Sequence, residues 1–115
     1  MHGAPAFVES MGGDPAICLE ILDVALEESQ TQIDAVTALW SGGSTDQARR
    51  AVHSLRGASA TFGASAFVAL LRQMESDCEA EETDKVLAAL DNFQKSASRY
   101  RDALAAMREE IRAMT

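Results

Sequence analysis

The stretch that decides the fold is residues 83–114, TDKVLAALDNFQKSASRYRDALAAMREEIRAM. Its apolar side chains recur at alternating steps of three and four residues: Val86, Leu90, Phe93, Ala97, Tyr100, Leu104, Met107, Ile111 and Met114. An α-helix turns once every 3.6 residues, so this spacing places them all on one face of a single long helix. We therefore predict a helix over residues 84–113, capped by Thr83 and with its apolar face buried against other helices.

Two earlier segments are bounded by residues that typically begin and end helices. Asp14, followed by proline, is a typical start, and a pair of glycines after tryptophan is a typical end, so we expect a helix over residues 15–40. Ser44, with a glutamine three residues later, has the form of a capping box. It predicts a second helix over residues 45–62, which Gly63 ends.

A third segment, residues 65–81, also carries its apolar side chains on one face: Phe67, Leu70, Leu71, Met74 and Cys78. Amphipathic helices joined by short connections, with no alternating strand pattern, predict an all-α fold. We expect an antiparallel up-down four-helix bundle forming one domain over residues 1–115. The N-terminal segment 1–13 contains Phe7 and Val8, which indicate a possible short helix that lids the core.

Charge and composition narrow the classes of partner. The net charge of -8 argues against nucleic acid, whose phosphates would be repelled, and favours a protein partner. No apolar stretch approaches the roughly 20 residues of a membrane helix, and no leader opens the chain, so neither membrane insertion nor export is expected. Cys18 and Cys78 lie in helical apolar patterns and are interpreted as reduced, core-filling thiols, which favours the cytoplasm.

One histidine lies off the apolar line of the second predicted helix. Its neighbours three and four residues away are Arg49, Arg50, Arg56 and Gly57, so the ring of His53 should face solvent among cations and a gap. A mid-helix glycine costs about 1 kcal/mol relative to alanine, which indicates that something approaches closely there. The plain alternative is a surface histidine without a role.

The stretch His53-Ser54-Leu55-Arg56-Gly57-Ala58-Ser59, followed by Gly63-Ala64, resembles the signature of histidine-containing phosphotransfer (HPt) domains. That signature has a histidine, an aliphatic residue two later, lysine or arginine three later, glycine four later, a small residue six later and glycine ten later. Every element is present, and the resemblance extends over nearly all of the chain. The one mild departure is Arg56, where lysine is commoner, which keeps the charge but changes the donor geometry.

The resemblance implies that His53 is phosphorylated and that Arg56 offsets the charge of the phosphoryl group. Family members often carry a glutamine or glutamate on the next helix within reach of the imidazole, and Glu75 matches that position. A carboxylate that accepts a hydrogen bond from Nδ1 would leave the Nε2 lone pair free to attack phosphorus. An ordinary solvated glutamate is the alternative for this residue.

Small side chains beside the histidine predict a docking surface for another protein. Gly57 and Ala60 carry little or no side chain, so a partner protein could reach the ring of His53 without meeting long side chains. Arg49 and Arg50 would contact an acidic partner, or would serve only as solubility residues. A metal site is not expected, because His2 is the only other histidine and makes no ligand spacing with the cysteines.

The resemblance implies a phosphorelay carrier that takes a phosphoryl group from one receiver domain and gives it to another. Its partners would be response-regulator receiver domains and a hybrid histidine kinase, and a monomer is expected. No intrinsic cofactor is expected, since Mg²⁺ would come from the partner, and no glycine-rich nucleotide loop indicates a kinase. The alternatives are the phospho-accepting N-terminal domain of a chemotaxis-type kinase and a helical docking protein without phosphoryl chemistry.

Overall fold

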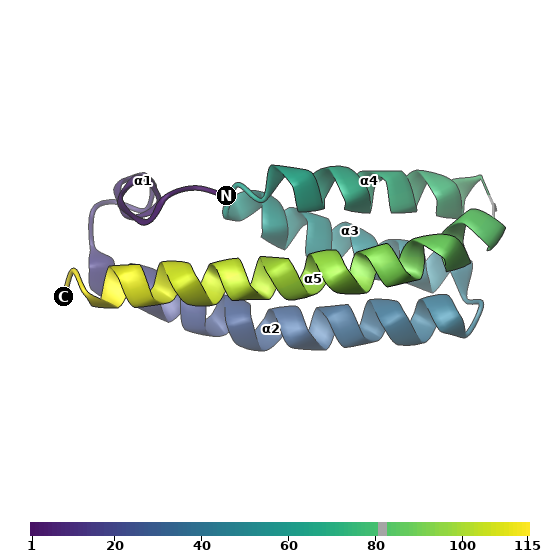
Figure 1. Ribbon diagram of the computed structural model, residues 1–115, viewed down its shortest axis with the longest axis horizontal. Coiled ribbons are helices and arrows are strands. Elements are labelled where there is room, and N and C mark those ends of the chain that lie inside the picture. The colour runs from purple at the N-terminus through teal and green to yellow at the C-terminus, as the bar shows by residue number, and fades with distance from the viewer. Residues whose placement is uncertain (81–82) are drawn as a thin grey trace.

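The computed structural model describes residues 1–80 and 83–115; the side chains of Thr83 and Val86 are not described. The predicted cap at Thr83 therefore lies outside the described side chains. The described chain forms five helices and no strand: α1 (Ala4–Ser10), α2 (Pro15–Ser41), α3 (Thr45–Thr61), α4 (Ser65–Glu79) and α5 (Thr83–Arg112) (Figure 1). The predicted all-α bundle is confirmed.

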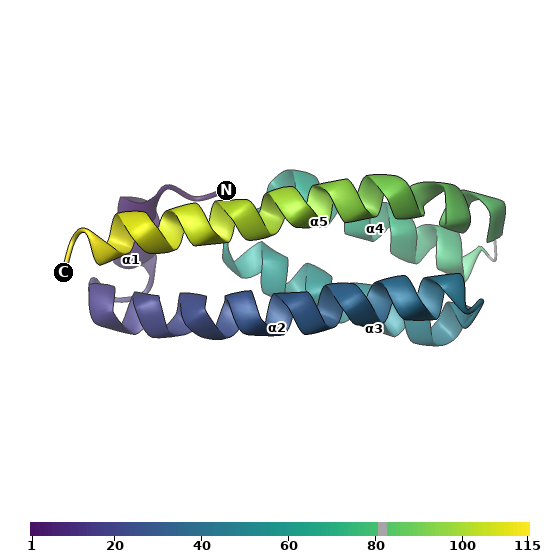
Figure 2. The same ribbon diagram turned by 60° about the horizontal axis from the view of Figure 1, so that its bottom comes forward.

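The four long helices form an elongated bundle of 47 × 19 × 19 Å (Figures 1 and 2). α2 packs against α3 and α5, and α4 packs against α3 and α5. In the described residues α2 and α4 do not touch, so they lie diagonally across the bundle. Short connections between neighbours make the arrangement antiparallel, and they bring α3 and α4 side by side.

Local chemistry sets the helix ends. The side chain of Asp14 accepts a hydrogen bond from the Ala16 N–H at 2.9 Å, as predicted for a cap. Gly43 and Gly63 adopt φ values of +74° and +69°, which glycine tolerates far better than other residues, and each follows the end of a helix. The capping box predicted at Ser44 is wrong in its chemistry: Ser44 is at the N-cap, but its side chain makes no capping hydrogen bond.

The core runs along the inner faces of all four long helices. Its largest fully buried side chains include Trp40, Leu55, Leu71, Phe93 and Leu104. Cys18 and Cys78 are buried and unpaired, as expected for core-filling thiols. Burial raises the pKa of Cys78 to about 11, with a further contribution from the neighbouring Asp77 carboxylate. The thiol is therefore un-ionised at neutral pH.

The short N-terminal helix covers one end of the bundle. α2 and α5, with 27 and 30 residues, are longer than α3 and α4, with 17 and 15, so their ends extend beyond the other pair. α1 packs against that extension (Figure 1). The rings of Phe7 and Phe62 lie 5.3 Å apart, and the His2 N–H donates to the Phe62 carbonyl. α1 thus lids the core where α3 ends.

Candidate functional site

His53 lies on α3, on the side opposite the buried face of that helix. Val52 and Leu55 are fully buried, whereas the side chain of His53 is 63% exposed. Since a helix rotates about 100° per residue, burial of these positions turns the imidazole outward. The predicted solvent-facing position of the ring is what the structure shows.

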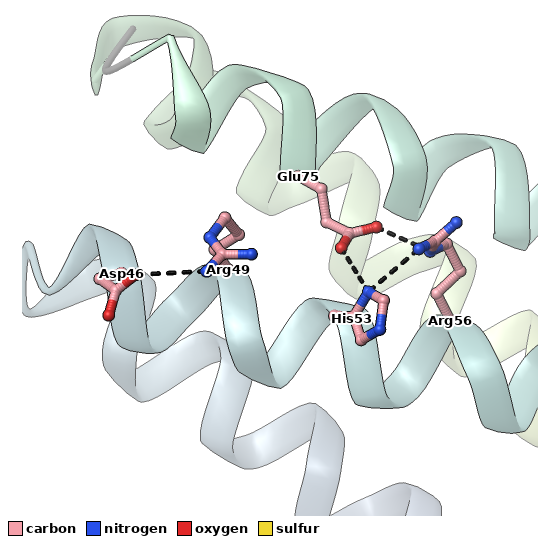
Figure 3. A network of polar contacts seen from close by, with 5 residues as sticks. All are labelled: Asp46, Arg49, His53, Arg56 and Glu75. Carbon is pink, nitrogen blue, oxygen red and sulfur yellow. Dashed lines mark hydrogen bonds and ion pairs between the residues drawn. The ribbon is translucent and has the colours of Figure 1, made fainter.

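A carboxylate from the neighbouring helix reaches the ring. Glu75 Oε1 on α4 lies 2.8 Å from Nδ1 of His53, and Glu75 Oε2 lies 2.7 Å from Nε of Arg56 (Figure 3). The side chain of Glu75 is only 12% exposed, and that of Arg56 is 26% exposed. The solvated alternative for Glu75 is therefore wrong: the carboxylate points into the seam between α3 and α4.

The surroundings of Nδ1 determine where the ring carries its proton. Nδ1 of His53 faces both Glu75 Oε1 at 2.8 Å and Nη2 of Arg56 at 3.0 Å. An ionised carboxylate only accepts hydrogen bonds and a guanidinium only donates them, so one ring nitrogen cannot satisfy both. Either bond would be charge-assisted, but the contact with the carboxylate is the shorter one, so we assign the proton to Nδ1. Nε2 is then left with its lone pair, on the side of the ring away from Glu75 (Figure 3).

Arg56 is held mainly by charge. Its Nε is buried and has no aligned hydrogen-bond partner in the described residues, although Glu75 Oε2 lies 2.7 Å away. The contact is therefore an ion pair rather than a well-directed hydrogen bond. Because both side chains are largely buried, the pair is screened less than a surface ion pair would be. Sequence spacing did not predict this ion pair.

Arg49 and Arg50 are not directed at the histidine. Nη2 of Arg49 lies 3.4 Å from Asp46 Oδ1, and Nη2 of Arg50 lies 3.2 Å from Asp46 Oδ2 (Figure 3 shows the first contact). Both arginines therefore pair with an acidic residue nearer the start of α3. Asp46 was not among the predicted site residues, although its spacing of three and four residues from the arginines is the signal for such pairs.

Gly57 and Ala60 leave open surface on the His53 side of α3. Both residues are exposed. A Cβ built on Gly57 meets no atom within 4 Å, and its φ is not in the left-handed region. Nothing within the described fold therefore requires glycine at this position.

The Ser59 side chain lies in the core behind the site. Its hydroxyl is fully buried and donates to the Leu55 carbonyl at 2.7 Å. Burial raises the pKa of the Tyr100 phenol, and a hydrogen bond with Ser59 partly offsets that rise. The small side chain at this position thus fits the packed core, and its hydroxyl has a hydrogen-bond acceptor.

The described residues form neither a metal-binding cluster nor a membrane-spanning helix. No group of three or more histidine, cysteine, aspartate or glutamate side chains is placed to hold a metal ion. No helix there is both long enough and apolar enough to cross a membrane.

Comparison with known proteins identifies the family. The family model of the Hpt domain matches residues 20–113, which include α3 with His53 and α4 with Glu75. Searches of curated proteins and of solved structures gave no match. Hpt domains are helical phosphocarriers that act in histidine phosphotransfer of two-component signalling. The chain therefore belongs to the Hpt domain family.

Proposed function

We propose that this protein relays a phosphoryl group through Nε2 of His53 between aspartates of receiver domains in a two-component phosphorelay. The observation that carries the proposal is an exposed imidazole whose Nδ1 lies 2.8 Å from a largely buried carboxylate, Glu75. This arrangement leaves one nitrogen free to react and holds the other in a hydrogen bond. The Hpt domain match over residues 20–113 supports it.

The chemistry of each transfer balances without a proton from solvent. The Nε2 lone pair of His53 attacks the phosphorus of an aspartyl phosphate, the P–O bond breaks, and its electron pair stays on the departing aspartate carboxylate. The ring becomes positively charged and keeps its proton on Nδ1, where Glu75 stabilises the charge. In the onward step an aspartate oxygen attacks phosphorus, and the electrons of the N–P bond return to Nε2.

Arg56 offsets the charge that the phosphoryl group brings. Its guanidinium lies 3.0 Å from Nδ1 of His53, close enough for a side-chain rotation to bring it toward a group on the ring. A guanidinium can hold two phosphoryl oxygens at once. Mg²⁺ and the accepting aspartate are supplied by the receiver domain in this proposal, since this chain contributes only the histidine and its two charged neighbours.

The proposed docking surface is the strip of small residues formed by Gly57 and Ala60. Open space beyond the Gly57 Cα allows a receiver domain to approach the helix backbone beside the ring. Arg50 is exposed, and among the described residues it pairs with the exposed Asp46, so it is available at the other end of the strip to an acidic receiver surface. The proposed donor is the receiver of a hybrid histidine kinase, and the proposed acceptor is a response regulator.

Labelling by a phosphorylated receiver domain tests the proposal. We expect the protein to acquire an acid-labile, base-stable phosphoryl label that the His53→Gln variant does not acquire. His2→Gln is the matched control and should label normally, because His2 lies at the N-terminus against Gly63. Binding without labelling would contradict the proposal and favour a docking protein. Labelling from a chemotaxis-type kinase but from no receiver would favour that alternative.

A further inference from the structure

A cleft opens between the start of α4 and the middle of α5, two helices that lie side by side (Figures 1 and 2). Its volume is about 340 Å³, within the range of roughly 300 to 1,000 Å³ that is typical of small-molecule sites. This size suits a ligand of one or two rings. The residues that line the cleft include Ala64, Phe67, Ser96, Arg99, Tyr100 and Ala103.

The base of the cleft is aromatic. Phe67 and Tyr100 are only 5% and 4% exposed, and their rings stack with centroids 4.9 Å apart. Ala64 and Ala103 line the cleft beside them, and longer side chains at these two positions would reduce its volume. Aromatic rings attract one another in stacked and tilted arrangements. A flat ring of a ligand can therefore pack against this base.

One polar side chain at the cleft has no partner. The hydroxyls of Ser65 and Ser96 each donate a hydrogen bond to a nearby residue, and the phenol of Tyr100 bonds with Ser59. Arg99 is exposed and forms neither an ion pair nor a hydrogen bond with any described residue. Its guanidinium stays charged and presents five N–H donors. These donors are available to a ligand.

The charge of the chain makes this free guanidinium informative. Aspartate and glutamate outnumber lysine and arginine by 18 to 10. Neighbouring cations on α5 use that excess, since Lys95 pairs with Asp91 and Arg108 pairs with Asp23. Arg99 stands instead at the edge of an apolar cleft without a carboxylate from the described residues. The cleft therefore suits an anion from outside the chain.

We propose that this cleft binds a small aromatic carboxylate. The ring of the ligand packs on Phe67 and Tyr100, and both carboxylate oxygens accept hydrogen bonds from the guanidinium of Arg99. A neutral aromatic compound would leave the arginine unpaired, and an aromatic amine would bring positive charge against it. An inorganic anion would leave the apolar base in water. A carboxylate on a flat ring satisfies both parts of the cleft.

The cleft is separate from the phosphoryl site. His53 and Glu75 meet between α3 and α4, whereas the cleft lies between α4 and α5. Phe67 precedes Glu75 by about 12 Å along the axis of α4, at 1.5 Å per residue. A ligand in the cleft therefore leaves the ring of His53 open to a receiver domain. The proposal goes beyond the phosphorelay and adds a small-molecule site to it.

Titration of the protein with 2-naphthoate, followed by amide chemical shifts, tests the proposal. We expect saturable shifts that cluster in residues 64–67 and 96–103. The dissociation constant should rise at least tenfold in Arg99→Gln and less in Arg99→Lys, which keeps the charge. Arg72→Gln is the matched control and should bind normally. Arg72 is also an exposed arginine without a partner among the described residues, and it does not line the cleft.

Two comparisons decide the outcome. The neutral analogue 2-naphthalenemethanol should bind at least tenfold more weakly than 2-naphthoate, because it cannot pair with Arg99. Equal affinity for the alcohol, equal loss of binding in Arg72→Gln, or shifts that never saturate would each overturn the proposal. His53→Gln should bind 2-naphthoate as the wild type does. Failure of phosphoryl labelling therefore leaves this proposal standing, and failure of 2-naphthoate binding leaves the phosphorelay standing.

Discussion

Replacing Gly57 should make this protein more stable and a slower phosphocarrier. A Cβ at this position meets nothing within 4 Å, and the residue lies in the interior of α3. Alanine is about 1 kcal/mol more favourable than glycine in a helix interior, so Gly57→Ala should stabilise the fold by roughly that amount. For a domain of this size, the melting temperature should rise by roughly 4 °C.

The cost of the substitution should appear in docking. A glutamine at position 57 would project into the open space beside His53 and hold a receiver domain away from the ring. We expect at least tenfold slower labelling by a phosphorylated receiver in Gly57→Gln, equivalent to about 1.4 kcal/mol, and a smaller effect in Gly57→Ala.

Phosphotransfer reactions stopped at timed intervals test the effect on docking, and thermal unfolding tests the effect on stability. The matched control is Ala106→Gln, because Ala106 is exposed on α5 away from the site, and it should label at the wild-type rate. Wild-type transfer by Gly57→Gln would refute the docking argument. A loss of stability in Gly57→Ala would show that the backbone needs glycine for some other reason.

Further predictions concern the site, the thiol of Cys78 and the core. Glu75→Gln keeps a hydrogen-bond acceptor for Nδ1 of His53, so its labelling rate should stay within a few-fold of wild type. Glu75→Leu removes that acceptor and leaves Arg56 without its ion pair. Its labelling rate should fall at least tenfold, in line with the usual contribution of a positioned polar group. The pKa of Cys78 is raised to about 11, so at pH 8 about one thiol in a thousand is ionised, and a thiol reagent should modify it only after urea unfolds the chain. Because the folded pKa lies above the ordinary value of 9.0, the unfolded chain ionises first and the free energy of unfolding should fall as pH rises from 9 toward 11, as urea titrations can show. Phe93→Ala empties a fully buried position and should cost about 3 to 5 kcal/mol in the same titration, while phosphotransfer at low temperature should persist.

The bundle could be predicted because local signals agree with the tertiary packing. The apolar steps through Phe93 and Leu104 specify a helical face without reference to any partner, and both residues are fully buried. Gly63 predicts the break after α3 because glycine tolerates a left-handed backbone. In the structure its φ is +69°, a conformation that other residues disfavour. These features depend only on neighbours in sequence.

The polar details of the site depend on how helices pack. Resemblance placed Glu75 near the histidine, but its ion pair with Arg56 follows from the rotation of α4 against α3, which sequence spacing does not specify. The side chain of Ser44 forms no cap although its spacing to Gln47 fits the motif, because a capping box also requires matching backbone geometry. In contrast, the pairing of Arg49 with Asp46 was readable from spacing alone.

The pairing of Glu75 with Arg56 has a consequence for turnover. Before transfer, the neutral imidazole and the two opposite charges sum to zero. A phosphoryl group brings about two negative charges and the ring gains one positive charge, so the loaded site carries a net charge of about minus one. In the proposed relay, the donor receiver domain has just given up this group, and its carboxylates then face a negatively charged site. The resulting repulsion should favour release of the donor once His53 is loaded.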